Sequence, residues 1–327
     1  MASVLVTGGA GYIGSHTALA LIGAGWSPVI IDNLVTGKRE LVPDKATFIE
    51  GDISDAALVR ATLKKHDCRA VLHFAGSTVV PESVSDPLKY YGNNTCASRS
   101  LIESVIAAQV GVMIFSSTAA VYGEPDALPI NEESMTAPIN PYGVSKLMTE
   151  WMLRDVAAAT PLRYAALRYF NVAGADPEGR SGQMTPEATH LIKVACQAAC
   201  GKRENITIFG DDYDTEDGTG VRDYIHVSDL ADAHVAALAY LMEGGESTIM
   251  NCGYGRGYSV KQVVDMVGSV ADVDMPVIMG PRRPGDSGAV YAASDRIRET
   301  LGWIPKHDDL KTIVESAYRW EKKINAA

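Results

Sequence analysis

The sequence is poor in cysteine, and the spacing of its cysteines does not match a metal site. The five are Cys68, Cys96, Cys196, Cys200 and Cys252, an odd number with no Cys-x-x-Cys pair. Cys196 and Cys200 lie four residues apart on an expected helix, but no histidine or second thiol pair completes a set of four ligands. We therefore expect no metal, a core-filling role for these two side chains, and reduced thiols as in the cytoplasm.

Long apolar runs and an excess of positive charge are also missing. No apolar run reaches the length that spans a bilayer, and the first expected strand begins so soon after Met1 that we expect no signal peptide. The formal net charge is −11, which argues against nucleic acid as the main partner because phosphate neutralisation needs clustered Lys and Arg. A small anionic ligand stays open, since a few local arginines suffice to bind one.

Strand and helix patterns alternate from residue 4 to about residue 170. Apolar segments at 4–6, 29–31, 46–50, 70–76, 112–117 and 164–171 predict strands, and 56–65, 97–109 and 141–158 are typical of helices. Apolar strands separated by helices predict a parallel sheet that is doubly wound and covered on both faces. We therefore expect an α/β, Rossmann-type fold.

Beyond residue 170 the regular alternation is lost, and we expect a second, smaller part. Helical patterns lie at 188–200, 228–241, 259–270 and 310–323, and a strand pattern lies at 248–253. The prediction is a Rossmann domain over 1–170 with a returning segment at about 222–253, and a smaller α/β lobe over 171–221 and 254–327. The acidic segment 211–220 is expected to be a solvated loop, because a calcium loop needs a different ligand register.

A glycine-rich turn follows the first strand and opens a helical pattern. Gly8, Gly11 and Gly14 allow a close approach of the backbone to a ligand, and the first N–H groups of the helix favour a pyrophosphate. Asp32 ends the second strand 18 residues after Gly14. A carboxylate there accepts hydrogen bonds from a ribose diol and repels a 2′-phosphate, which predicts NAD rather than NADP. The alternative for Asp32 is a helix N-cap.

A tyrosine and a lysine share one face of the helix expected over 141–158. Tyr142 and Lys146 are spaced i and i+4. A phenol is a poor base near neutral pH, and a nearby ammonium group lowers its pKa by stabilising the phenolate. Downstream of a dinucleotide turn, this pair predicts a proton-transfer site.

Ten sequence blocks, taken together, resemble a known family. They are residues 7–16, 32–33, 50–53, 73–76, 90–94, 116–123, 141–146, 168–171, 218–227 and 281–286. The chain resembles the extended short-chain dehydrogenases/reductases nearly end to end, and within them the branch that inverts C4 of UDP-sugars. The most specific blocks are Arg-Asp-Tyr-Ile-His-Val at 222–227 and Arg-Arg-Pro-Gly-Asp at 282–286.

The resemblance implies a reversible C4 epimerisation of UDP-galactose and UDP-glucose, with hydride transfer to and from tightly bound NAD through a 4-keto sugar. The implied catalytic residues are Tyr142, Lys146 and Thr118. The implied NAD contacts are Gly8, Gly11, Tyr12, Ile13, Gly14, Asp32, Asn33, Asp52, Ile53, Phe74, Ala75, Gly76, Asn93, Tyr142, Lys146 and Phe170. The implied contacts with the UDP-sugar substrate are Thr118, Tyr142, Asn171, Leu191, Thr207, Phe209, Arg222, Arg283, Asp286 and Val290. The resemblance also implies a homodimer formed by helices at 97–109 and 145–158.

The chain departs from the family pattern at three places. Thr118 replaces the usual catalytic serine, and a threonine hydroxyl offers the same donor and acceptor. Ser77 and Thr78 stand where a lysine is common, which puts one cofactor contact in doubt. Val290 stands where relatives carry either a bulky tyrosine or a small residue, so we expect a wider sugar pocket that also accepts UDP-N-acetylhexosamines.

Three other functions compete with this prediction. A sugar-nucleotide dehydratase is disfavoured, because Ala119 and Ala120 cannot transfer the protons that its Asp-Glu pair transfers. A 4-epimerase for another UDP-sugar, a pentose or a uronate, stays open. A non-catalytic NAD-sensing module is disfavoured by the joint presence of Thr118, Tyr142 and Lys146.

Overall fold

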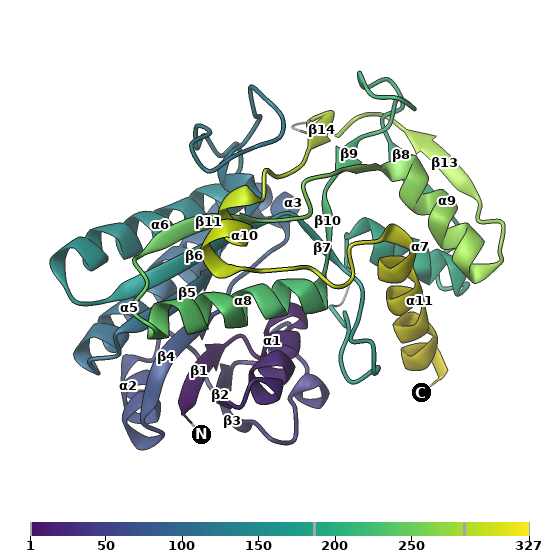
Figure 1. Ribbon diagram of the computed structural model, residues 1–327. Helices are drawn as coiled ribbons and strands as arrows, with labels where there is room; N and C mark the ends of the chain where they lie inside the picture. Colours follow the sequence, from purple (N-terminus) through teal and green to yellow (C-terminus); the bar gives the residue numbers. More distant parts are fainter. Residues whose placement is uncertain (1, 186–187, 284–285, 327) are drawn as a thin grey trace.

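The centre of the structure is a parallel sheet of seven strands. The computed structural model describes residues 2–185, 188–283 and 286–326. The strand order is β11-β6-β5-β4-β1-β2-β3, and every neighbouring pair is parallel (Figure 1). The strands are β1 (Ser3–Thr7), β2 (Ser27–Asp32), β3 (Thr47–Glu50), β4 (Cys68–His73), β5 (Val112–Ser116), β6 (Arg163–Tyr169) and β11 (Thr248–Cys252). The Rossmann-type α/β fold expected from the sequence is thus confirmed.

Helices cover both faces of this sheet. Successive side chains of a strand point to opposite faces, and both faces are apolar, so each needs a covering layer. On one face, Val4 and Val6 of β1 belong to the core under α1 (Tyr12–Gly23) and α8 (Val227–Met242). On the other, Leu5 belongs to the core under α2 (Ala56–Lys65), α5 (Ala97–Ala107) and α6 (Pro141–Ala159). The two layers of helices are visible on either side of the strands in Figure 1.

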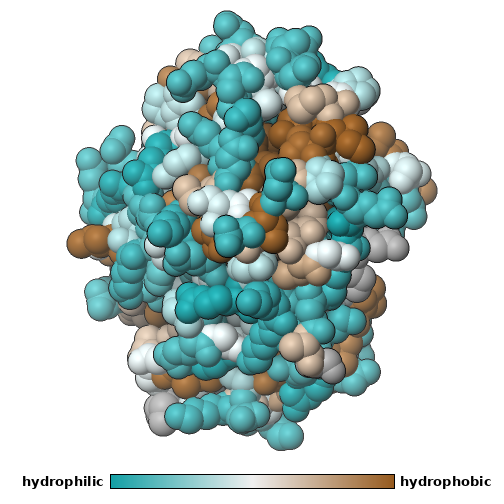
Figure 2. Space-filling view, turned by 90° about the vertical axis from the view of Figure 1, so that its right-hand side faces the viewer, coloured by the Kyte–Doolittle hydropathy of each residue, from teal (hydrophilic) through white to brown (hydrophobic). Residues whose placement is uncertain are grey.

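The remaining elements gather at the right of Figure 1 and along the upper edge of the sheet. They include α7 (Leu191–Ala199), α9 (Val260–Ala271), α10 (Asp295–Leu301) and α11 (Leu310–Ala326). Three small sheets accompany them: β7 (Asn171–Ala173) with β10 (Tyr224–His226), β8 (Ile206–Phe209) with β13 (Val277–Gly280), and β9 (Val221–Arg222) between β12 (Tyr258–Ser259) and β14 (Ala289–Val290). The end of the molecule that carries α9 and β13 is mostly hydrophilic, with an apolar area in its upper part (Figure 2).

Most predicted elements are present, with corrections at their ends. The strand predicted over 164–171 is two strands, because the chain leaves the main sheet at Phe170 and β7 pairs with β10 instead. The helix predicted from residue 188 begins at Leu191. The short helices α3 (Val80–Ser85) and α4 (Pro87–Tyr90) lead into a π-helical turn, Tyr91–Cys96, just before α5.

Buried histidines make the stability of this fold sensitive to acid. Burial lowers the pKa of His16 and His234 to about 4 and that of His73 and His226 to about 3. An unfolded histidine titrates near 6.5, so between pH 6.5 and 4 the unfolded chain binds more protons than the folded one. The free energy of unfolding therefore falls as the pH falls through this window. Burial raises the pKa of the Asp223 carboxyl to about 6, so its protonation stabilises the folded state as the pH falls. This cancels the destabilising effect of about one of the four histidines.

We predict that urea unfolding at pH 5 gives a free energy of unfolding roughly 3–6 kcal/mol below that at pH 7. The control is His234→Gln, which removes one titrating group and should reduce the pH dependence. Equal stability at pH 5 and pH 7 would contradict the assignment of neutral, buried histidines.

Candidate active site

The carboxyl ends of four neighbouring strands bring the predicted cofactor and catalytic residues to one edge of the sheet. Gly8 follows β1, Asp32 ends β2, and Gly76 lies three residues beyond β4. Thr118 lies two residues beyond β5. Ligands of open parallel sheets bind at this edge, where the strand order reverses. Here that point lies between β1 and β4, beside the glycine turn.

The turn between β1 and α1 is too tight for any residue but glycine at two positions. Gly8 has φ +69°, and a Cβ there would lie 2.6 Å from the Ala75 backbone nitrogen. A Cβ on Gly14 would lie 2.3 Å from the Gly8 carbonyl oxygen. The helix N-cap, Gly11, makes no side-chain hydrogen bond, so the first N–H groups of α1, from Tyr12 and Ile13, are left for a ligand. This open cradle of amides fits the pyrophosphate of a dinucleotide.

Asp32 is held in place by main-chain donors and caps no helix. One carboxylate oxygen accepts from the Ala10 N–H (2.9 Å) and the other from the Leu34 N–H (2.8 Å). Burial raises the pKa of Asp32. The neighbouring Asn33 donates to Asp52 (2.8 Å), so two residues predicted to contact NAD meet across β2 and β3. The helix N-cap alternative for Asp32 is therefore wrong.

The other predicted cofactor contacts lie around β4. Ile53 is buried in the core beside α2, and the segment of Phe74, Ala75 and Gly76 leaves β4 directly under the glycine turn. Asn93, in the π-helical turn, donates to the Ser77 hydroxyl (2.9 Å). Ser77, which stands where the family pattern has a lysine, thus orients the amide of Asn93.

The helix α6 begins at a capped residue and carries Tyr142 and Lys146 on its buried face. The Asn140 side chain accepts from the Gly143 N–H (2.9 Å), and Pro141 occupies the first helical position, where no N–H is needed. Lys146 donates to the Ser116 carbonyl oxygen (3.0 Å) at the end of β5. The pair predicted from the sequence therefore faces the carboxyl end of the sheet.

Burial acts against the charged form of both groups. It raises the pKa of Tyr142, and a hydrogen bond with Thr118 counteracts part of that effect. Burial also lowers the pKa of Lys146 to about 8, although the Glu150 carboxylate acts in the opposite direction. Desolvation of the phenolate thus outweighs the hydrogen bond with Thr118. The expectation that Lys146, together with a bound nicotinamide ring, lowers the pKa of Tyr142 stays a prediction.

Glu150 and Arg168 form a buried ion pair that joins the helix of Tyr142 and Lys146 to β6, and neither is among the site residues predicted from the sequence. Arg168 donates to both carboxylate oxygens of Glu150 (3.0 and 2.6 Å), and Ser117 donates to the same carboxylate (2.5 Å). Glu150 is 1% exposed and lies i+8 from Tyr142 on α6. The sequence does carry a signal for this role, because Glu150 continues the four-residue spacing of Tyr142 and Lys146 on the same helix face.

Three predicted substrate contacts lie on neighbouring short strands. Asn171 opens β7, which pairs with β10, while Arg222 ends β9 opposite Val290 of β14. Arg222 donates to the carbonyl oxygens of Val221 (2.9 Å) and Gly288 (3.4 Å). Val290 also packs against the apolar cluster that contains Phe170. The structure thus brings Asn171, Arg222 and Val290 together beside a predicted cofactor contact.

The remaining predicted substrate contacts form a second group. The Arg283 guanidinium lies 4.0 Å from the centre of the Phe209 ring. Thr207 is on the same strand, β8, and Leu191 opens α7. Asp286 donates its N–H to the Arg283 carbonyl oxygen (3.2 Å). Pro284 and Gly285, between these two, lie outside the described residues.

Within residues 2–185, 188–283 and 286–326, no three His, Cys, Asp or Glu side chains gather closely enough to hold a metal ion. Over the same residues, each helix is too short or too polar to cross a membrane. All five cysteines carry free thiols, with Cys196 buried as expected for a core residue.

Comparison with known proteins agrees with the geometry of the site. Residues 4–253 match the model of the NAD dependent epimerase/dehydratase family. The chain belongs to this family. It is 59% identical over 321 residues to a UDP-glucose 4-epimerase of Azospirillum brasilense, covering 98% of this chain and 92% of that protein.

Solved structures of the family are similar over nearly the whole chain. The UDP-glucose 4-epimerase from Brucella ovis in complex with NAD is 46% identical with a TM-score of 0.96, covering 98% of this chain and 99% of that one. The UDP-Glc/GlcNAc 4-epimerase from Campylobacter jejuni is 47% identical with a TM-score of 0.87, covering 99% and 100%. The resemblance to the extended short-chain dehydrogenases/reductases is confirmed.

We predict that Gly14→Ala lowers the NAD content of the purified protein and destabilises it by about 1–3 kcal/mol, because the new methyl group collides with the Gly8 carbonyl. The control is Gly23→Ala in the same helix, where a Cβ meets nothing within 4 Å. NAD released on denaturation and urea unfolding measure the two effects. A Gly14→Ala protein with full NAD content and stability would contradict the cradle.

Proposed function

We propose that this protein interconverts UDP-galactose and UDP-glucose by inverting C4 of the sugar, with NAD kept in the site. The observation that carries the proposal is the meeting of Tyr142, Lys146 and Thr118 at the sheet edge that bears the dinucleotide turn. The 59% identity to a UDP-glucose 4-epimerase over nearly the whole chain supports the same activity.

In this proposal, the residues of α6 handle the proton while the cofactor handles the hydride. Bound NAD supplies the acceptor and donor for the hydride of C4. Tyr142 takes the proton of the 4-hydroxyl and returns it, and Thr118 orients the phenol through their hydrogen bond. Lys146 stays protonated at pH 7, because its pKa is about 8, and its charge favours the phenolate.

We propose a matching division of the chain between the two ligands. Residues 1–170 with the returning segment at about 222–253 hold NAD through the turn at Gly8 and the carboxylate of Asp32. Residues 171–221 and 254–327, together with Arg222 at the start of the returning segment, hold the UDP group. Its diphosphate would be bound by Arg222 and Arg283, whose planar guanidinium groups suit phosphate oxygens. A firmly held nucleotide leaves the sugar free to turn between its two faces.

The direct test is incubation of pure protein with UDP-galactose and no added cofactor. We predict that UDP-glucose forms, and that Tyr142→Phe lowers kcat by at least about a hundredfold while the NAD content stays the same. Chromatography of the nucleotide sugars measures the conversion. Absence of conversion by the unaltered protein would contradict the proposal, and full activity of Tyr142→Phe would contradict the role of the phenol.

We propose that the sugar pocket also accepts UDP-N-acetylhexosamines. Val290 is small and lies opposite Arg222, and the related Campylobacter jejuni protein is named a UDP-Glc/GlcNAc 4-epimerase. We predict turnover of UDP-GlcNAc by the unaltered protein and its loss in Val290→Tyr, which keeps UDP-galactose turnover within about threefold. Val290→Thr is the size-matched control. No turnover of UDP-GlcNAc by the unaltered protein would refute a widened pocket.

We also propose a cytoplasmic homodimer that pairs through α5 and α6. Trp151 of α6 is 45% exposed, and α6 lies on the side of the molecule opposite β13 (Figure 1). We predict a dimeric mass by light scattering and a shift towards monomer in Trp151→Glu, because a charge would be buried between copies. The control is Ile304→Glu, since Ile304 is an exposed apolar residue outside these helices. A monomer for the unaltered protein would contradict this assembly.

A further inference from the structure

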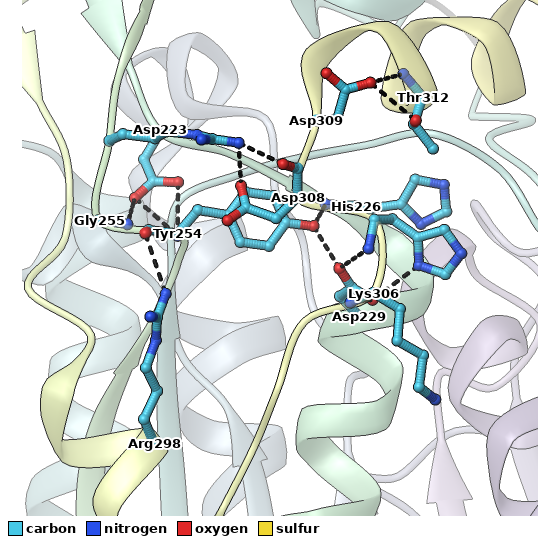
Figure 3. Close-up of polar contacts among 12 residues, drawn as sticks. Asp223, His226, Asp229, Tyr254, Gly255, Arg298, Lys306, Asp308, Asp309 and Thr312 are labelled. Atoms are coloured by element: carbon cyan, nitrogen blue, oxygen red, sulfur yellow. Dashed lines mark hydrogen bonds and ion pairs between the residues drawn. The ribbon is translucent and has the colours of Figure 1, made fainter.

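Asp223 is a fully buried carboxylate whose partners are main-chain N–H groups. One oxygen accepts from Tyr254 N–H (3.0 Å), and the other accepts from Gly255 N–H (3.1 Å) and Ala292 N–H (3.3 Å). Figure 3 shows the carboxylate turned towards the backbone of Tyr254 and Gly255. A buried carboxylate is costly unless it is hydrogen-bonded. The three N–H groups hold the carboxylate in place, and the carboxylate in turn fixes the main chain that carries them.

The main chain of Asp223 joins two further segments. Its N–H donates to the Val290 carbonyl oxygen (3.1 Å), and its own carbonyl oxygen accepts from the Asn171 N–H (2.9 Å). Arg222 precedes it in the chain. One residue therefore connects β7, the β9–β10 segment, β14 and the loop after β11, and three of these segments carry Asn171, Arg222 and Val290.

The main chain at Gly253 packs closely against the carboxylate. A Cβ on Gly253 would lie 2.6 Å from an Asp223 carboxylate oxygen. Burial raises the pKa of Asp223 to about 6, and its bonds to the Tyr254, Ala292 and Gly255 backbones act in the opposite direction. At neutral pH the site therefore holds a buried carboxylate despite the free-energy cost of burying a charge. An apolar side chain would fill the space without that cost.

We propose that Asp223 is a positioning residue for the UDP-sugar: it fixes the strands that carry Asn171, Arg222 and Val290 so that the nucleotide meets a preorganised site. This inference rests on the proposed function. It assigns to Asp223 no contact with substrate and no part in proton transfer. Loss of the carboxylate lets the strands move and raises the entropic cost of binding. None of the hydrogen bonds of Asp223 goes to a residue of α6, so we expect catalysis at saturation to be unchanged.

The chain offers a matched control in Asp229, which belongs to the same polar cluster (Figure 3). Asp229 is 1% exposed and accepts from the N–H groups of Lys306 (3.0 Å) and His307 (2.9 Å) and from the Tyr254 hydroxyl (2.6 Å). It thereby ties the segment before α11 to the start of α8. It is buried like Asp223 and also accepts from main-chain N–H groups, but it has side-chain partners as well, the Tyr254 hydroxyl and the His307 ring (2.8 Å). It does not bind the strands that carry Asn171, Arg222 and Val290.

The experiment compares Asp223→Ala with Asp229→Ala, both with their bound NAD. Affinity for UDP is measured by calorimetry, and KM and kcat are measured with UDP-galactose. We expect Asp223→Ala to weaken UDP binding and to raise KM about tenfold, with kcat and NAD content within about threefold of the unaltered protein. We expect Asp229→Ala to lower the melting temperature and to leave UDP affinity unchanged.

A second variant keeps the test decisive if Asp223→Ala does not fold. Asp223→Asn retains one carbonyl oxygen for the N–H groups of Gly255 and Ala292 and should weaken UDP binding in the same direction by a smaller factor. Unchanged UDP affinity in a folded Asp223 variant overturns the inference, as does an equal loss of affinity in Asp229→Ala. If UDP-galactose is not converted by the unaltered protein although UDP binds, the proposed function fails and the positioning of a UDP site is still tested by calorimetry.

Discussion

The buried ion pair between Glu150 and Arg168 is the interaction on which the active site depends. It joins α6 to β6, and removing one partner of such a pair costs about 3–5 kcal/mol, because the other charge is left buried without compensation. Tyr142, Lys146 and Glu150 recur every fourth residue of α6, so fixing Glu150 also fixes the direction in which the other two point. Ser117 binds the same carboxylate, which ties the end of β5 to the helix. The position of Tyr142 is therefore set by a polar contact inside the core.

A second constraint acts on the other side of the site. The dinucleotide turn is tightly packed, because the backbones at Gly8 and Gly14 lie against their neighbours. The strands β7, β9 and β14, in contrast, are only two or three residues long. Strands this short gain little stability from their own ladder, so their position is set by the residues that cross-connect them. Steric contact thus sets the glycine turn, and hydrogen bonds set the short strands. Under the proposed function, the first holds a cofactor that stays and the second a substrate that leaves.

Much of this arrangement is predictable from the sequence, because strands, helices and the glycine turn are encoded by local spacing. Alternating apolar segments predict the sheet, Asp32 is a predicted contact because it ends a strand, and Tyr142 and Lys146 are a predicted pair because of their i, i+4 spacing. The rest depends on contacts between distant segments. The partner of Lys146 is the Ser116 carbonyl, and the role of Glu150 depends on Arg168 of β6. Phe170 separates β6 from β7, which pairs with a different strand. The raised pKa of Tyr142 is a property of burial, which the spacing of two residues does not report.

The central claim is that one site removes a hydride from C4 and returns it to the same carbon, while Tyr142 carries the proton. The most direct test uses UDP-galactose with deuterium at C4 of the sugar, incubated with the protein in ordinary water, and locates the deuterium in the product by NMR. The account predicts UDP-glucose that retains deuterium at C4, because the hydride does not exchange with water. UDP-glucose that carries hydrogen from water at C4 would contradict it.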